Sequence, residues 1–475
     1  MSSERRAGRR TAAKKGTRFF HPYADGVPVR VVLLTLLAAL AFLRPAPVTA
    51  AAAPAAPAAP WLFVSDVHLE PLDTSPRPSP PGHDTNPVLL RSALAEMRRV
   101  DPAPPVVVIS GDYIGHRYDP KHALDTMARV AHAFGAAFPH AQFVLALGNE
   151  DSDCGDYGAG AGAPFLRAMA NLWAPLVDRN GAAPHFRATF PRDGFYVARL
   201  PLRGLRAVVI DDVFASPRFR AACGASGSAS VAQTFADLER ALPSGGTGRA
   251  WVVMHVPPGV DAYSTVHLAH GLGVVPFLDS GARDRLTEVL GDPRRHVALA
   301  LAGHTHKFGF RVVGDPAGDG VPLLIVPALS PIFENAPMFL TAEPGPGGTL
   351  GGIVEHAFDG RAWRAADASR ELDLPRLTGP ALGGLERRLD AEPALRTVFS
   401  RLYDGGAPPE ITPANWRGYR CAISALGDTA YRRCLGERGL GFLTVRGLVA
   451  GVLLAVALLF FGAFALLAGR RFFAR

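Results

Sequence analysis

Six apolar runs in the chain have the length and composition of buried β-strands. None contains a charged residue, and continuous apolar runs suit strands that are covered on both faces. The runs are 61–65, 106–110, 143–147, 251–254, 297–301 and 321–329. Helical apolar spacing occurs over 87–100, 121–138 and 231–242, and a closing strand pair is expected over 353–365. This alternation predicts an α/β fold.

Five of the six runs are followed by residue types that bind metal ions. The candidate ligands are Asp66, His68, Asp112, Asn149, His255, His304 and His306. The sixth run ends in Ser330 and Pro331 and offers no obvious ligand. Because ligands in open α/β sheets bind beyond the carboxyl ends of the strands, these side chains predict a metal site at that edge.

The spacing of the candidates supports this prediction. Asp66 and His68 are two residues apart, which in an extended segment places both side chains on one face, and His304 and His306 repeat the spacing. Glycine stands directly before three of the candidates, where it allows a sharp turn after the strand. Each piece alone is more often a simple turn or a structural histidine, so the argument rests on the ordered set.

The donor types favour a pair of divalent cations. Two such ions can hold a phosphoryl group and make a bound water nucleophilic at neutral pH, and they need roughly six to eight protein donors with a bridging carboxylate. The seven candidates meet this requirement. Mixed Asp, Asn and His ligands suit Zn, Mn, Fe or Co, so the sequence does not select the metal.

The ordered motifs D-x-H, G-D, G-N-x-D, H and G-H-x-H resemble the calcineurin-like metallophosphoesterase superfamily over about residues 60–340. Within it, the segment Gly-Asp-Tyr-Ile-Gly-His (111–116) is similar to the acid-sphingomyelinase-like phosphodiesterase and polyphosphatase branch, and 330–337 resembles that branch more weakly. The resemblance implies a four-layer α/β/β/α sandwich with two sheets.

The resemblance also assigns a role to each matching position. It implies that Asp66, His68 and His306 hold the first metal, that Asn149, His255 and His304 hold the second, and that Asp112 bridges the two. It places His116 beside the leaving group as a proton donor, a task that suits a side chain with a pKa near neutrality. The alternative for His116 is an ordinary surface histidine.

One position departs from the family pattern. Many members read G-N-H-D or G-N-H-E, where the His is a second proton donor, whereas this chain has Glu150 there. Glu150 can donate a proton only if burial raises its pKa, and in its charged form it would repel a phosphate. The departure therefore affects the identity of the acid catalyst and of the substrate. The metal ligand expected in this motif is retained, because Asn149 is present.

The net charge of +8 does not indicate a nucleic-acid partner. Residues 1–30 carry eight basic and two acidic residues and 470–475 carry three basic ones, which more than accounts for the whole charge. Residues 31–43 form a short apolar run and 48–50 offer a small-residue cleavage site, so 1–50 is expected to be a signal peptide, with an uncleaved anchor as the alternative. An Ala/Pro linker follows over 51–60.

The C-terminal end predicts a membrane anchor. Residues 447–469 are uncharged over a length that spans a bilayer, and the basic tail 470–475 favours the cytoplasmic side. The body is therefore expected on the periplasmic, extracytoplasmic side. The four cysteines fit an exported chain, and we expect Cys154–Cys223 and Cys421–Cys434 disulfides because each pair stays within one region; four unrelated buried thiols are the alternative.

The chain changes character after about residue 370. We expect a catalytic domain over 61–368 and a small helical cap over 369–444, with helical spacing at 382–389, 394–403 and 422–434. The cap either shapes substrate access or is a spacer that packs on the core. The sequence does not determine the oligomeric state.

The expected function is metal-dependent hydrolysis of a phosphoester, with a phosphodiester favoured because His116 would protonate an alkoxide. Phosphoanhydride or polyphosphate hydrolysis is the enzymatic alternative, although only Arg117 and Lys307 lie next to the motifs as extra positive charges. A non-catalytic metal-binding surface protein is the rival from another class, and Glu150 is the feature that favours it. A cytoplasmic protein phosphatase would conflict with the expected topology.

Overall fold

The computed structural model describes residues 59–117, 119–158, 164–220, 227–268 and 273–436. The expected signal peptide, most of the linker and the expected membrane span over 447–469 lie outside these residues. Within the described part of the chain, no helix is both long enough and apolar enough to cross a membrane. The predicted anchor therefore stays a prediction.

The first sheet joins the beginning and the end of the catalytic domain. Its order is β12-β11-β10-β1-β2-β3, with β13 beside β11. The strands are β1 (Trp61–Val64), β2 (Val106–Ile109), β3 (Gln142–Leu145), β10 (Met338–Pro344), β11 (Leu350–Phe358), β12 (Trp363–Asp367) and β13 (Arg376–Leu377). β1, β2 and β3 run parallel, and β10 pairs antiparallel with β1 in the register Leu62 to Thr341. The expected closing pair is confirmed as β11 and β12.

The second sheet is built from the middle of the chain and has the order β4-β5-β6-β7-β9-β8. Its strands are β4 (Tyr196–Arg199), β5 (Leu205–Val209), β6 (Arg249–Val253), β7 (Val297–Ala302), β8 (Gly309–Val313) and β9 (Val321–Ile325). β5, β6, β7 and β9 are parallel neighbours, which brings the carboxyl ends of β6 and β7 to one edge.

The two sheets face each other, and apolar side chains fill the space between them. The Trp61 and Trp251 rings meet edge to face with their centroids 5.1 Å apart, and the Phe63 ring packs on Trp251 with a centroid distance of 6.2 Å. Along β6, Trp251 and Val253 belong to this inner core, whereas Ala250 and Val252 belong to a second core on the opposite face of the sheet. The alternation is the period of two expected of a strand covered on both sides.

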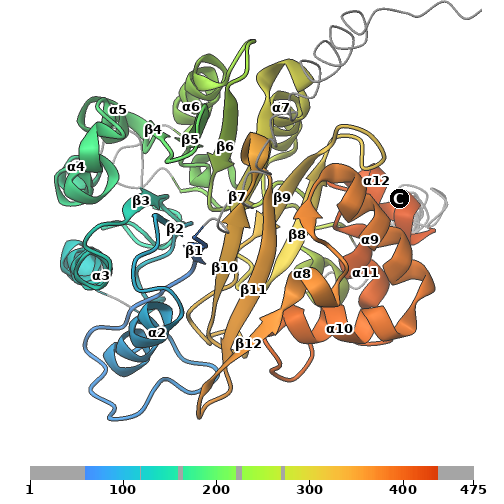
Figure 1. The fold of residues 1–475 in the computed structure, drawn as a ribbon, viewed down its shortest axis with the longest axis horizontal. Helices are drawn as coiled ribbons and strands as arrows, with labels where there is room; N and C mark the ends of the chain where they lie inside the picture. Colours follow the sequence, from blue (N-terminus) through green and yellow to red (C-terminus); the bar gives the residue numbers. More distant parts are fainter. Residues whose placement is uncertain (1–58, 118, 159–163, 221–226, 269–272, 437–475) are drawn as a thin grey trace, which may run out of the picture. The chain divides into compact units, whose positions relative to one another are not determined.

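Helices cover the outer faces of the sheets (Figure 1). They are α2 (Pro87–Val100), α3 (Ala123–Ala137), α4 (Pro164–Val177), α5 (Phe186–Asp193), α6 (Gly227–Ala241), α7 (Ser280–Gly291) and the single turn α8 (Ala368–Glu371). α2 and α3 share the core of the first sheet, and α6 and α7 supply the outer core of the second. The mixed α/β fold with two helix-covered sheets is therefore confirmed.

Four helices after the sheets form the cap, which we define as residues 379–435. They are α9 (Gly379–Ala391), α10 (Pro393–Tyr403), α11 (Trp416–Cys421) and α12 (Asp428–Leu435), and they lie beside β8 (Figure 1). The helical spacing over 422–434 was only partly right, because α11 ends at Cys421 and the chain stays extended at Gly427 before α12. The reason lies in the intervening turn, where Ile423 accepts a hydrogen bond from the Val312 amide of β8 at 2.7 Å.

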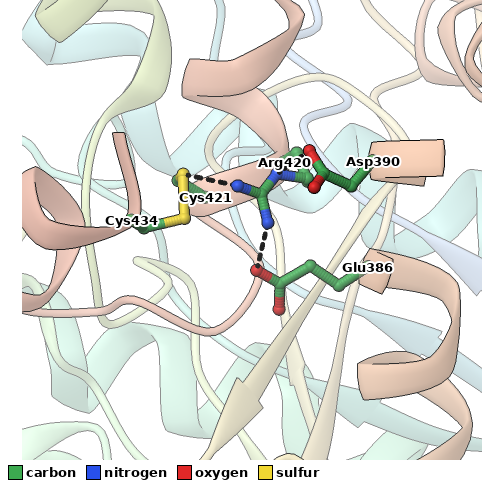
Figure 2. Close-up of a disulfide and its surroundings, with 5 residues drawn as sticks. All are labelled: Glu386, Asp390, Arg420, Cys421 and Cys434. Atoms are coloured by element: carbon green, nitrogen blue, oxygen red, sulfur yellow. Dashed lines mark hydrogen bonds and ion pairs between the residues drawn. A yellow bond between two sulfur atoms is a disulfide. The ribbon is translucent and has the colours of Figure 1, made fainter. Parts of the chain in front are cut away.

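A disulfide closes the cap. Cys421 at the end of α11 is bonded to Cys434 in α12, which confirms one expected pair. Figure 2 shows Arg420 beside this bond, where its guanidinium donates to the Glu386 carboxylate of α9 at 3.3 Å and lies 3.8 Å from Asp390. The bond and the ion pairs thus tie three cap helices together. The other expected pair includes Cys223, which lies outside the described residues.

Candidate metal centre

All seven candidate ligands meet at one edge of the two sheets. The loops that carry them are fastened to one another by main-chain hydrogen bonds, from the amide of Asp66 to the carbonyl of Gly111 (3.0 Å) and from Gly303 to His255 (2.9 Å). The His304 amide also donates to both carboxylate oxygens of Asp66, at 3.1 Å. The two sheets are therefore joined directly at the site.

Backbone strain is concentrated in these loops. Five of the seven candidates have positive φ angles: Asp66 (46°), His68 (40°), Asp112 (56°), His304 (69°) and His306 (62°). Left-handed conformations are uncommon for residues other than glycine and collect at functional sites, where the surrounding structure enforces them. The extended geometry expected for Asp66 and His68 is therefore wrong, although the two side chains do converge, with His68 Nε2 3.8 Å from Asp66 Oδ1.

The first group of donors gathers around His68. Its Nε2 atom lies 3.1 Å from Nε2 of His306, and His306 Nε2 lies 3.3 Å from Asp66 Oδ1. A ring nitrogen of His116 is within 4.8 Å of ring nitrogens of both histidines. The structure thus brings together the three residues expected at the first metal and places His116 beside them.

The second group gathers around His255. Its Nε2 atom lies 3.0 Å from Asp112 Oδ2 and 3.2 Å from Asn149 Oδ1, and His304 joins Asp112 and His255 within 4.8 Å. The same Asp112 Oδ2 lies 3.5 Å from His68 Nε2 of the first group. Asp112 therefore stands between the two groups, where a bridging carboxylate is expected.

The hydrogen bonds of the histidines suit metal ligation. His68 Nδ1 is 2.8 Å from the Ile114 carbonyl and His255 Nδ1 is 2.7 Å from the Ser110 carbonyl. Each Nδ1 must donate to its carbonyl, so the Nε2 lone pair of the neutral ring points into the site, as in metal-bound histidines whose other nitrogen is fixed in this way. Two such lone pairs facing carboxylate oxygens at 3.0–3.8 Å fit cations between them. The residues present therefore fit a pair of divalent metals.

The electrostatics agree with a site built for positive charge. Although burial opposes ionisation, His306 and His68 lower the pKa of Asp66 to about 2. Burial likewise disfavours charged histidines, but Asp112 and Asp66 raise the pKa of His68 to about 9. These shifts favour an ionised Asp66 and a protonated His68, and a metal ion bound to His68 would displace that proton.

Asp151 supports the site in a way that the sequence did not show. Its carboxylate accepts hydrogen bonds from the amides of Asp112 (2.9 Å), Tyr113 (2.7 Å) and Gly148 (2.8 Å). The loops after β2 and β3 are therefore fastened to one buried side chain. The final D of the G-N-x-D motif was the available signal for this role.

His116 is held by Asp84, which sequence reasoning missed. Asp84 lies in the Pro-rich loop after β1 and accepts hydrogen bonds from the His116 amide at 2.8 Å and from its Nδ1 at 2.9 Å. Ser330 Oγ donates to the same Asp84 carboxylate at 3.3 Å. The sixth apolar run, which ends at Ser330 and offers no metal ligand, therefore also contributes a contact near the site. The His116 ring stacks on His68 at 4.2 Å, and the exposed Phe333 packs against it edge-on at 5.6 Å.

Glu150 is buried beside the candidate bridge. Its amide donates to Asp112 Oδ1 at 2.8 Å, and its side chain is 5% exposed. Burial and the Asp112 charge raise the pKa of Glu150 to about 9. The condition that the sequence set for a neutral, proton-bearing Glu150 is therefore met in the protein without metals.

A cavity of about 790 Å³ opens from the two donor groups toward the cap. Asp112, Asn149, His304 and His306 line one part of it, and the cap residues Phe399, Tyr403, Glu410 and Tyr419 line another. Three cationic side chains also line the cavity: Arg218, Lys307 and Arg311. Only Lys307 was visible in the sequence as a neighbour of a motif, because the other two reach the cavity through tertiary packing.

Known proteins resemble the chain in sequence. No family model matches the chain. A sphingomyelinase phosphodiesterase D of Dictyostelium discoideum is 22% identical over 270 residues, covering 54% of this chain and 56% of that protein. An acid sphingomyelinase-like phosphodiesterase 3b of Homo sapiens is 24% identical over 257 residues, covering 52% and 53%. The chain thus spans about half the length of these relatives.

A solved dimetal phosphatase from Danio rerio is 15% identical, with 65% of this chain and 99% of that chain covered and a TM-score of 0.41. The class that the motifs, the two sheets and the relatives support is the metallophosphoesterase superfamily, whose enzymes are phosphoric ester hydrolases. Within that class the chain is similar to the acid sphingomyelinase-like phosphodiesterases, as its sequence predicted.

Proposed function

We propose that this protein is a binuclear metal-dependent phosphodiesterase. The observation that carries the proposal is the position of Asp112, whose Oδ2 atom lies within 3.5 Å of one histidine in each donor group. When bound there, two divalent cations would polarise a phosphoryl group and lower the pKa of water. Asp66, His68 and His306 would hold one cation, and Asn149, His255 and His304 the other.

His116 would supply the proton for the leaving group. Its Nδ1 is bound to Asp84 at 2.9 Å, so the ring orientation is fixed and Nε2 is the nitrogen left for substrate. Water oxygen would add to phosphorus, the ester P–O bond would break, and the proton would pass to the departing alkoxide. A proton donor matters most for an alkoxide, which is why a phosphodiester of an alcohol is favoured.

Two features of the cavity support an anionic organic substrate larger than phosphate. Its volume of about 790 Å³ lies in the range of sites that take drug-sized molecules. Arg218 and Arg311 add positive charge that the sequence did not reveal, which also favours the phosphoanhydride alternative more than the motifs alone did.

We also propose that the catalytic domain acts on the extracytoplasmic side of a membrane. The support is the disulfide in the cap, since such bonds persist in oxidising compartments, together with the basic and apolar termini of the sequence. Alkaline phosphatase fused after residue 436 in place of the C-terminal segment tests this. Activity of the fusion in intact cells is expected, whereas an inactive but intact fusion protein would contradict the location.

The substrate class is tested by comparing metal-loaded enzyme on a phosphodiester, a phosphomonoester, pyrophosphate and polyphosphate, each with and without chelator. We expect chelator-sensitive hydrolysis with the diester fastest. Faster cleavage of pyrophosphate or polyphosphate would replace the diester with a phosphoanhydride. Bound metal without hydrolysis of any of the four would favour the non-catalytic metal-binding protein.

A further inference from the structure

Arg311 is a buried cation in the wall of the cavity. It lies on β8, where it is only 7% exposed, and it lines the same cavity as the candidate metal ligands. Arginine is almost never buried to this extent without a partner of opposite charge, because an unpaired charge in the interior loses its hydration. The guanidinium therefore requires an account of its partners.

The partners of Arg311 within the protein are neutral. Its Nη1 donates to the Phe310 carbonyl at 2.9 Å and its Nη2 to the Val260 carbonyl at 3.4 Å, while its buried Nε has no hydrogen-bond partner. Among the described residues, none forms an ion pair with it. Burial lowers the pKa of its guanidinium, and the Asp261 carboxylate, whose charge acts in the opposite direction, forms no ion pair with it.

The other two cationic side chains of the cavity, Lys307 and Arg218, are paired or exposed to solvent. Lys307 is paired with Asp404 at 2.7 Å and with Glu410 at 3.2 Å. The Asp261 carboxylate accepts hydrogen bonds from the amide and hydroxyl of Ser264, at 2.9 and 2.6 Å. Arg218 is exposed to solvent. Arg311 is thus the cation of this wall that is buried and forms no ion pair within the described part of the chain.

Arg311 is separate from the donor groups but within reach of the same ligand. It lies where β8 meets the turn at Gly259 and the cap residue Leu426, since a Cβ on Gly259 would contact both side chains at 3.7 and 3.1 Å. It follows the candidate ligand His306 by five residues, so their Cα atoms are at most about 17 Å apart. A single ligand that fills the cavity could therefore contact both.

We propose that Arg311 forms an anion-binding subsite, and that the substrate carries a second anionic group in addition to the phosphoryl group that is cleaved. The ligand class is a phosphodiester or phosphoanhydride with a further carboxylate or phosphate several bonds from the scissile phosphorus. This inference rests on the proposed function, because the subsite takes part in a reaction only if the protein hydrolyses such a substrate. That anionic group would supply the counter-charge and would accept charge-assisted hydrogen bonds from the guanidinium.

Two series of 4-nitrophenyl phosphodiesters test the subsite. In one, the second ester is an alkyl chain of increasing length that ends in a carboxylate, and in the other the same chain ends in a methyl group. At the best length we expect wild type to prefer the carboxylate by about tenfold or more in kcat/KM. Arg311→Met should lose this preference and keep its activity on the methyl series within about twofold.

Arg179→Met is the control for loss of a carbonyl-bound guanidinium, at a half-buried position. Arg179 is also held by carbonyls, those of Phe138 and Ala141 at 3.3 and 2.6 Å, and it is not among the residues that line the cavity. It should keep the wild-type preference. The proposal is overturned if wild type shows no preference at any chain length, or if Arg311→Met lowers both series equally.

Thermal unfolding separates this inference from the proposed function. If wild type hydrolyses neither series, the phosphodiesterase assignment fails, and the subsite is judged by stability alone. Removing a buried charge that has no ion pair should change Tm little or raise it, because Met fills the same space without the cost of burying a charge. A large Tm loss for Arg311→Met would show that the guanidinium serves the fold and would contradict the subsite.

Discussion

The edge that carries the candidate ligands and the cap are held in place by different means. At the edge, residues such as Asp66 and His68 sit in left-handed conformations and are surrounded by buried carboxylates and histidines. The cap consists of short amphipathic helices closed by one disulfide. The contrast teaches that left-handed backbone and clustered histidines mark the edge where chemistry is expected, whereas the cap is held by packing, a disulfide and ion pairs.

One cluster joins the two regions. The ammonium of Lys307, which directly follows the candidate ligand His306, contacts Asp404 and Glu410 of the cap and the carbonyl of Phe333 at 3.2 Å. Lys307 is 4% exposed and Asp404 is fully buried. The cap is therefore attached at the site itself as well as along β8, and this supports a cap that shapes substrate access rather than a remote spacer.

Removing a ligand from either donor group should have the largest effect. His68→Ala and His255→Ala should each lower bound metal and reduce kcat/KM by about 10³-fold or more, because the metals supply several kcal/mol of transition-state stabilisation. Metal analysis and diester hydrolysis measure this. His296→Ala is the control, since His296 also has a positive φ, of 51°, and is in none of the donor groups. Full metal content and activity in His68→Ala would contradict the role of this edge as the metal centre.

His116 should matter according to the leaving group. His116→Ala should lower kcat about 10²- to 10⁴-fold for a dialkyl phosphodiester and much less for a 4-nitrophenyl ester, whose leaving group needs no proton. The kcat of Asp84→Asn on the dialkyl phosphodiester should lie between those of wild type and His116→Ala. The exposed neighbour His83, changed to Ala, serves as control. Equal losses on both esters would show that His116 acts as a metal ligand or structural residue instead.

Breaking the junction should mainly reduce stability. Lys307→Met leaves Asp404 buried without its cation, and loss of one partner of a buried pair costs about 3–5 kcal/mol. Urea unfolding measures the change, and limited proteolysis reports whether the cap is released. Lys121→Met is the control, because that lysine is exposed and should contribute little. Unchanged stability in Lys307→Met would mean that the cap does not depend on this junction.

The disulfide should have the smallest effect on the site. Cys421→Ser with Cys434→Ser opens a loop of 13 residues and should lower the unfolding free energy by about 3 kcal/mol while metal content stays at the wild-type level. Calorimetry and metal analysis measure the two quantities. Loss of metal in this variant would show that the cap and the donor groups are coupled through more than Lys307.

The charge-free strands and the candidate ligands could be predicted because both depend on local patterns, whereas β4, β5, β8, β10 and β13 contain charged residues and were missed. A charge-free run followed by Asp or His indicates a strand end, and all seven candidates do converge. Partners that come from distant segments could not be predicted: Asp84 meets His116 across 32 residues and Asp404 meets Lys307 across 97. The left-handed backbone of Asp66 was also unforeseen, because it is imposed by the Gly111 and His304 contacts rather than by the residue itself.

The most direct test of the account measures bound metal per chain and hydrolysis of bis-(4-nitrophenyl) phosphate on the purified protein, in wild type and in Asp112→Asn. We predict two divalent ions per wild-type chain, activity that is lost with chelator and restored by metal, and an Asp112→Asn protein that binds fewer ions and is inactive. A wild-type chain without bound metal, or an Asp112→Asn variant with undiminished activity, would contradict the binuclear centre.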